Sequence, residues 1–464
     1  MDKDTLLDDI LKERANSESL SIPEALNEKI NMTLANLPER RKNKGRGFKR
    51  AAVAAAITIA AVTSLSIAFP AYARNLPVVS SVFQFLSDKN LIDKEYVKYS
   101  SDLNISKTSN GITVTIDSIV YDGIDLSIGY TVESEKEIIG GMHILDKDFK
   151  INGKVTSFAS GGRGKLIDKH TYVGVDSFSV ANDYMPKEMG KNFLGGYIKI
   201  PENYIMDLNI KEFSGGTKGQ WDFKFKVSSD KVKGKVTRVK TGIDLSELRP
   251  GLKVNEVVFT PINTALRTVE DNNNSDELVE YFVFDDKGRA LQNKGATGSG
   301  SAELNALYLE YTFKNIYEDT KSVIFIPAEY TKEYNDKVKN SNGAWSNDLK
   351  EVPLNINSST ILSEGKYGGY KITKVEFLEG KTAVYYECTG LISAISPYGL
   401  MIEDEGGKVY SLGFEESKEL GYNRFVAEVG PMDRSKKYKL KAVDEEKRYD
   451  VREDLKFTVE VNKN

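Results

Sequence analysis

The sequence predicts a mainly β protein, with short N-terminal α-helices, one transmembrane helix and three tandem antiparallel β-sandwich domains of immunoglobulin-like type. Three observations lead to this fold class. An uncharged segment of 23 residues, 51–73, follows a strongly basic stretch. The residues before it carry apolar side chains at helical spacing. The long remainder of the 464-residue chain consists of runs in which apolar and polar residues alternate.

Residues 1–50 are expected to form two short amphipathic helices. Asp4 can cap the first helix, and Ser21 followed by Pro23 can begin the second. Two short helices cannot bury their apolar faces well against each other, so this segment is expected to bind a partner. The alternative is an inner tail with weak helical tendency and no partner. The apolar residues expected to contact the partner are Leu6, Leu7, Ile10 and Leu11 in the first helix and Leu26, Ile30, Leu34 and Leu37 in the second.

Residues 51–73 form the predicted transmembrane helix, because a helix that rises about 1.5 Å per residue crosses a hydrocarbon core about 30 Å thick within this length. Seven of the eleven residues 40–50 are Lys or Arg, whereas Arg74 alone follows the other end of the segment. Basic flanks stay in the cytoplasm, so the N-terminus is predicted to lie inside the cell and the C-terminus outside. The basic stretch is expected to contact anionic lipid headgroups, and no binding to nucleic acid is expected.

A cleaved secretion signal is the alternative interpretation of the apolar segment. Ala71, Tyr72 and Ala73 form the small-x-small pattern that signal peptidases cut. A signal peptide has a short basic leader, whereas a patterned segment of fifty residues precedes the apolar stretch here, which favours a membrane anchor. The span also contains Ser and Thr residues and ends near Pro70, so it is easier to unwind than a Leu-rich helix and suits intramembrane proteolysis.

The extracellular part is predicted to contain three copies of one β unit. Runs with a period of two, separated by Gly, Asp and Asn turns, are typical of antiparallel strands, and their density suggests β-sandwiches. Each copy also has an acidic turn 34 or 35 residues after its first glycine. The copies open at Gly111, Gly251 and Gly369, have their acidic turns at Asp146, Asp285 and Asp404, close on alternating strands at 221–227, 349–356 and 455–461, and are assigned to residues 95–230, 235–357 and 358–464.

Two histidines and one cysteine limit the chemistry that the chain can perform. His143 and His170 accompany no nucleophile motif, so surface positions are expected for both. A zinc site would have to rely on carboxylates. Cys388 falls in an apolar strand and is expected to be a buried, inert thiol. A mostly extracellular chain with a single cysteine fits the exterior of a Gram-positive bacterium.

Three polar stretches are candidates for ligand sites. Residues 271–277 are rich in oxygen ligands, but the EF-hand pattern fails because Phe282 occupies its twelfth position, so a polar hairpin loop is expected. The Gly-rich stretches 161–165 and 295–301 lack the spacing of a phosphate-binding loop and are expected to be mobile loops. No catalytic residue, cofactor or metal ligand is therefore assigned, and the chain is predicted not to be an enzyme.

The order of these segments resembles a family of membrane-anchored bacterial proteins of unknown function that are encoded beside extracytoplasmic-function sigma factors. The resemblance is carried by residues 22–27, the basic run, the apolar span and residues 69–83, and it covers residues 22 to about 230 best. Members of this family are presumed anti-sigma factors. The zinc-binding His/Cys pattern of the commonest anti-sigma domain is missing, and zinc-free versions are part of the resemblance.

The resemblance implies a single-pass anti-sigma factor whose cytoplasmic helices hold a sigma factor inactive and whose extracellular domains sense the state of the envelope. Its partners would be a sigma factor, the membrane, an envelope ligand and processing proteases, with cleavage near Ala71, Ala73 and Arg74 releasing the sigma factor. The alternative is a membrane-anchored binding or adhesion protein without a sigma partner. An exported enzyme is a third possibility, which no motif supports.

Overall fold

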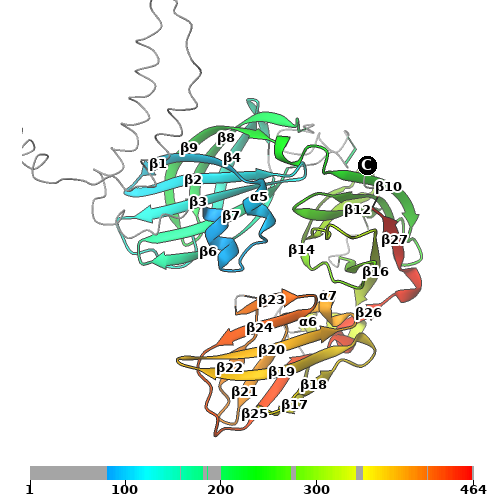
Figure 1. Ribbon diagram of the computed structural model, residues 1–464. Coiled ribbons are helices and arrows are strands. Elements are labelled where there is room, and N and C mark those ends of the chain that lie inside the picture. Colours follow the sequence, from blue (N-terminus) through cyan, green and yellow to red (C-terminus); the bar gives the residue numbers. More distant parts are fainter. Residues whose placement is uncertain are drawn as a thin grey trace, which may run out of the picture. The chain divides into compact units, whose positions relative to one another are not determined.

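The computed structural model describes residues 81–156, 158–180, 185–186, 200–272, 278–340, 348–414 and 416–461 (Figure 1). The predicted cytoplasmic segment 1–50, the predicted membrane helix 51–73 and every residue assigned to partner binding or cleavage lie outside these ranges. The prediction of a mainly β protein is confirmed, since the described residues form antiparallel sheets and a few short helices. Among these residues, no helix has the length and apolar character needed to span a membrane.

Two sheets form the first sandwich, and their facing side chains share one core. Trp221 from one sheet and Tyr130 from the other are both fully buried there. The first sheet has the order β1 (Ser101–Ser109), β2 (Ile112–Tyr121), β3 (Asp125–Ser134), β7 (Thr171–Ser179), β6 (Ala159–Asp168), and the second has the order β5 (Lys154–Thr156), β4 (Ile144–Ile151), β8 (Asn203–Phe213), β9 (Thr217–Ser228).

The second sandwich repeats this plan and includes strands from the end of the chain. A 3-10 helix, η2 (Asp230–Val232), precedes it, and η4 (Glu453–Leu455) lies between its last two strands. Its first sheet has the order β10 (Thr237–Asp244), β11 (Lys253–Phe259), β12 (Asn263–Asp271), β15 (Ala306–Lys314), β14 (Asn293–Ser301), and its second has the order β13 (Glu280–Asp285), β16 (Ser322–Tyr330), β26 (Tyr449–Val451), with β27 (Phe457–Glu460) also paired to β16.

The third sandwich lies in sequence between β16 and β26 and follows α6 (Lys332–Asn340). Three short elements, η3 (Gly365–Tyr367), α7 (Ile392–Ile395) and α8 (Glu445–Arg448), accompany its strands or follow them. Its first sheet has the order β18 (Thr360–Ser363), β19 (Gly369–Leu378), β20 (Lys381–Thr389), β24 (Arg424–Val429), β23 (Ser417–Gly421), and its second has the order β17 (Leu349–Leu354), β25 (Tyr438–Val443), β21 (Met401–Asp404), β22 (Val409–Ser411).

Two strands differ from their expected assignments. The alternating run 349–356 was expected to close the second copy, but β17 pairs with β25 of the third sandwich. The run 455–461 was expected to close the third copy, but β27 pairs with β16 of the second. Phe457 stacks on Phe325 of β16 with ring centroids 5.1 Å apart, and Val459 is buried in the same core. Alternation predicts a strand but does not specify its neighbour, so the third sandwich is in fact inserted into the second.

The two Gly-rich stretches are edge strands, β6 and β14, and the expectation of mobile loops was wrong. The glycines make room for side chains of the neighbouring strand. A Cβ atom at Gly162 would overlap the carboxylate of Asp176, one at Gly164 would overlap the Tyr172 hydroxyl, and one at Gly298 would overlap the Leu309 side chain. The glycines of β6 and β14 therefore allow close packing against the neighbouring strands of their sheets.

Candidate functional site

The described residues that come first after the predicted membrane segment form a strap, defined here as residues 81–100. It contains two short helices, α4 (Val82–Asp88) and α5 (Glu95–Tyr99). Every site residue predicted from the sequence lies outside the described ranges. Among the described residues, the strap is nearest in sequence to the predicted membrane and cleavage segments. The candidate site is therefore the strap together with the residues that hold it in place.

Local chemistry begins the first strap helix. The Ser81 side chain caps α4, because its Oγ accepts a hydrogen bond from the backbone N–H of Phe83 at 3.1 Å. The helix ends after Asp88, and Asn90 turns the chain in the left-handed region at φ 56°. Helices of seven and five residues are too short to persist in water on their own, so tertiary contacts must stabilise them.

The outer face of the first sheet supplies these contacts. Val82, Phe83 and Leu86 are buried in a cluster with outward-facing valines of β2 and β7. Gly129 of β3 lies directly beneath, and a Cβ atom there would lie only 3.1 Å from Val82 Cγ1. The backbone N–H of Val82 donates to Asp117 Oδ1 at 2.9 Å. The strap is thus seated on the sheet by apolar burial, a glycine and one directed hydrogen bond.

A buried polar joint connects the first and second sandwiches through two hairpin turns. Asp122, at the β2–β3 turn, accepts backbone hydrogen bonds from Ile124 and Asp125 on Oδ1. Its Oδ2 accepts from Thr260 Oγ1 at 2.7 Å and from Asn263 Nδ2 at 3.1 Å, both at the β11–β12 turn. All acceptor positions on this carboxylate are therefore used, as burial requires.

A second set of contacts supports the joint from the sheets behind it. Arg267 of β12 is buried, with Nε 2.7 Å from Glu310 Oε2 and Nη1 2.8 Å from Glu256 Oε2. Ser179, at the end of β7, donates to Glu310 Oε1 at 3.1 Å. Burial raises the pKa of Glu310, and burial together with the neighbouring carboxylates raises the pKa of Asp125 well above its ordinary value.

The two histidines and the cysteine have definite surroundings. His143 Nδ1 lies 3.6 Å from Asp176 Oδ1, the Tyr172 hydroxyl lies 3.4 Å from its Nε2, and the ring is partly exposed. His170 Nδ1 lies 3.1 Å from the Ser134 carbonyl oxygen. Cys388 is buried as predicted, and burial raises the pKa of its thiol, which leaves it protonated and inert. Within the described ranges, no cluster of three or more His, Cys, Asp or Glu residues could hold a metal ion.

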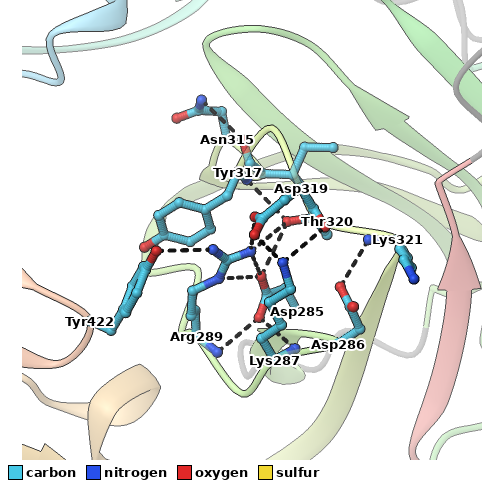
Figure 2. A network of polar contacts seen from close by, with 11 residues as sticks. Asp285, Asp286, Lys287, Arg289, Asn315, Tyr317, Asp319, Thr320, Lys321 and Tyr422 are labelled. Carbon is cyan, nitrogen blue, oxygen red and sulfur yellow. Dashed lines mark hydrogen bonds and ion pairs between the residues drawn. The ribbon is translucent and has the colours of Figure 1, made fainter.

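The repeated acidic turns are structural motifs. Asp285 Oδ1 accepts from the backbone N–H groups two and four residues later, at 3.0 and 2.9 Å, and Asp404 Oδ1 does the same at 2.9 and 3.0 Å. Figure 2 shows how the first turn extends into a network, in which Arg289 points at Asp285 and Asp319. Asp146, expected to be the acidic turn of the first copy, instead lies inside β4.

Aromatic rings complete this network. The Arg289 guanidinium carbon lies 4.0 Å from the centroid of the Tyr317 ring and 5.1 Å from that of Tyr422, which comes from the β23–β24 hairpin of the third sandwich (Figure 2). Lys314 adds an ion pair with Glu419 of the same hairpin at 2.8 Å. The acidic turn of the second sandwich thus also fastens the inserted third sandwich.

Comparisons with known proteins identify two parts of the chain. Residues 43–134 match a domain of unknown function, DUF4179, and residues 234–356 match a family of unknown function, DUF5643. No curated protein matches the chain. Among solved structures, the chain is similar to a conserved domain protein from Bacillus anthracis, with 20% sequence identity, a TM-score of 0.43, and coverage of 60% of this chain and 90% of that one.

The two matched segments begin and end at different places in the fold. The first match begins in the basic stretch, includes the apolar segment and the strap, and ends at the last residue of β3. The second begins just before β10 and extends past β17 of the third sandwich, without β26 or β27. The strap therefore belongs to the same matched unit as the predicted membrane segment.

Proposed function

We propose that this protein is a single-pass membrane anti-sigma factor of a Gram-positive bacterium. Its residues 1–50 hold an extracytoplasmic-function sigma factor inactive in the cytoplasm, and its three extracellular sandwiches, of immunoglobulin-like type, sense the state of the envelope. Cleavage near Ala71, Ala73 and Arg74, followed by cleavage within the span 51–73, releases the sigma factor.

One observation carries this proposal. A single matched unit, residues 43–134, joins the basic stretch, the apolar segment and the strap to the first three strands. This continuity supports a protein in which the membrane segment and the first sandwich work together. The strap supports the same idea, because it is fixed to the sheet by buried side chains from Val82 onward, eight residues after Arg74.

The orientation is tested by reporter fusions at residues 45 and 100. The seven cations of residues 40–50 predict a cytoplasmic reporter at residue 45 and an extracellular one at residue 100. A cytoplasmic reporter at residue 100 would end the proposal.

Sigma-factor binding is tested by co-purification from solubilised membranes, using the full-length chain and each extracytoplasmic-function sigma factor of the host in turn. Leu26→Asp combined with Ile30→Asp should abolish retention of the cognate sigma factor, because an unpaired charge buried in an interface costs several kcal/mol. The matched control is Asn27→Asp with Asn31→Asp, which adds the same charges outside the apolar stripe and should retain the partner. If no sigma factor is retained by the unmodified chain, the anchored binding protein becomes the better description.

A further inference from the structure

The strap touches more than the first sandwich. Asp93, between α4 and α5, forms an ion pair with Lys294 at the start of β14, with Nζ 2.9 Å from Oδ2. The same ammonium group lies 5.4 Å from the centroid of the Tyr96 ring. Burial alone would raise the pKa of Asp93, but the charges of Lys294 and Lys314 hold it below its ordinary value, so the pair stays ionised.

Apolar contacts also join the strap to the second sandwich. Ile262, in the β11–β12 turn of the second sandwich, is buried in the cluster that contains Phe83, Leu86 and Tyr96 of the strap. Val232 belongs to the same cluster and lies in the linker between the two sandwiches, defined here as residues 229–236. The strap is therefore covered both by the linker and by the second sandwich.

The linker also makes polar contacts with the end of α5. Lys235 Nζ lies 4.8 Å from the centroid of the Tyr99 ring, and Lys231 donates a hydrogen bond to the Ser100 carbonyl oxygen. The strap is therefore surrounded by the outer face of the first sheet, the inter-sandwich linker and the second sandwich.

The Asn263 side chain connects the contacts around the strap to the buried polar joint. Asn263 Oδ1 accepts a hydrogen bond from Lys294 Nζ at 3.0 Å, while its Nδ2 donates to Asp122 Oδ2 at 3.1 Å. Lys294 also donates to the carbonyl oxygen of Ile262 at 3.1 Å. Lys294, Ile262 and Asn263 all belong to the second sandwich, so opening the joint would carry Lys294 away from Asp93 and remove the apolar cover of the strap in the same movement.

We propose that the strap is a latch clamped between the first and second sandwiches, and that parting these sandwiches releases it. The released helices unfold, because seven- and five-residue helices do not persist without tertiary contacts. Resting on the function proposed above, this release is the regulatory step: a ligand that opens the joint frees the chain next to the cleavage region near Arg74.

The test is hydrogen exchange on the full-length chain in membranes, comparing residues 82–99 with β8 and β9 as an internal reference. Lys294→Met should accelerate exchange in the strap at least tenfold, because it removes the ion pair. Asp93→Asn should act similarly and leaves the second sandwich unaltered, which keeps the test decisive if Lys294→Met folds poorly. Lys253→Met, an exposed lysine of the same sandwich, is the matched control and should change nothing.

The variant that separates a latch from an ordinary contact is Asn263→Ala, since this side chain reaches the strap through Lys294. It should accelerate strap exchange as well, and it should increase cleavage of the chain in cells. Unchanged strap exchange in Asn263→Ala, or in both Lys294→Met and Asp93→Asn, would overturn the latch. Retention of the sigma factor, measured separately on the unmodified chain, decides the proposed function, so the two failures are distinguishable.

Discussion

Substitutions of glycines in the first sheet test how tightly the strap packs on that sheet. Gly129 faces the strap, where an added Cβ would lie 3.1 Å from Val82 Cγ1 and 3.5 Å from the Phe83 ring. Optimal carbon–carbon contacts are about 3.5–4.0 Å, so the first contact is too close by roughly half an ångström. Gly129→Ala should cost little, because the strap can shift by that amount and alanine is favoured over glycine in strands by about 0.5–1 kcal/mol.

A larger side chain at this position leaves no such compromise. Gly129→Leu should displace α4, lowering the free energy of unfolding by about 1–3 kcal/mol, the usual cost of overpacking. The inner core should stay intact, because Gly129 lies on the outer face. Two other glycines serve as comparisons: Gly161→Ala has open space around the new Cβ and should be neutral or slightly stabilising, whereas Gly174→Ala would place a Cβ 2.7 Å from Tyr172 Cε1 and should damage the core itself.

Urea unfolding followed by Trp221 fluorescence, with Trp345→Phe in every variant, measures core stability, and hydrogen exchange of residues 82–99 measures strap docking. The expected order of core stability is Gly161→Ala, Gly129→Leu, Gly174→Ala, from highest to lowest. Gly129→Leu alone should raise strap exchange while β8 and β9 remain protected. A Gly129→Leu protein with a fully protected strap would refute the reasoning that this glycine seats the helix.

Three further predictions concern the second and third sandwiches. Burial raises the pKa of Glu445 to about 7, above an unfolded value of about 4.3, so the folded state binds the extra proton between these values and stability should fall as pH rises from about 4.3 to 7. Glu445→Gln should remove this fall, gaining roughly 3 kcal/mol at pH 8 and nothing at pH 4 in urea titrations, and an unchanged pH profile would contradict it. Arg289→Met leaves Asp285 buried without its cation and should cost about 3 kcal/mol, measured by thermal denaturation against Lys287→Met as the exposed control. Deleting residues 358–464 should abolish cooperative unfolding of the second sandwich because β26 and β27 are lost, whereas replacing 349–443 by a short Gly/Ser linker should preserve it; calorimetry that finds both deletions equally stable would refute the insertion.

Local pattern was sufficient to predict several of the strands. The alternation around Val114 and Ile116 produces β2, and the turn at Asp122 and Gly123 leads into β3. The buried thiol of Cys388 also follows directly from its apolar neighbours. These features depend on residues close in sequence, which is the information that periodicity contains.

The strap and the joint could not be predicted in this way. The apolar residues Val82, Phe83 and Leu86 have helical spacing, but a seven-residue helix is defined by the sheet beneath it and leaves only a weak local signal. Asp122 shows its turn chemistry in the sequence, whereas its bond to Thr260 spans 138 residues. The Gly-rich strands were misassigned for a related reason, because the volume that fills the space above Gly164 belongs to Tyr172 on another strand.

Local sequence pattern could not predict the insertion of the third sandwich either. This insertion has a physical consequence. β26 and β27 pair with the two halves of one edge of β16, whose other edge pairs with β13. Without the end of the chain, β16 would expose a row of unpaired backbone groups and the apolar side chains of Phe325 and Val323. The second sandwich therefore becomes complete only after the third has been synthesised. The third sandwich is in turn attached at both of its ends, so a load on it reaches β16 and β26 together, within the sandwich that supplies Lys294 to the strap.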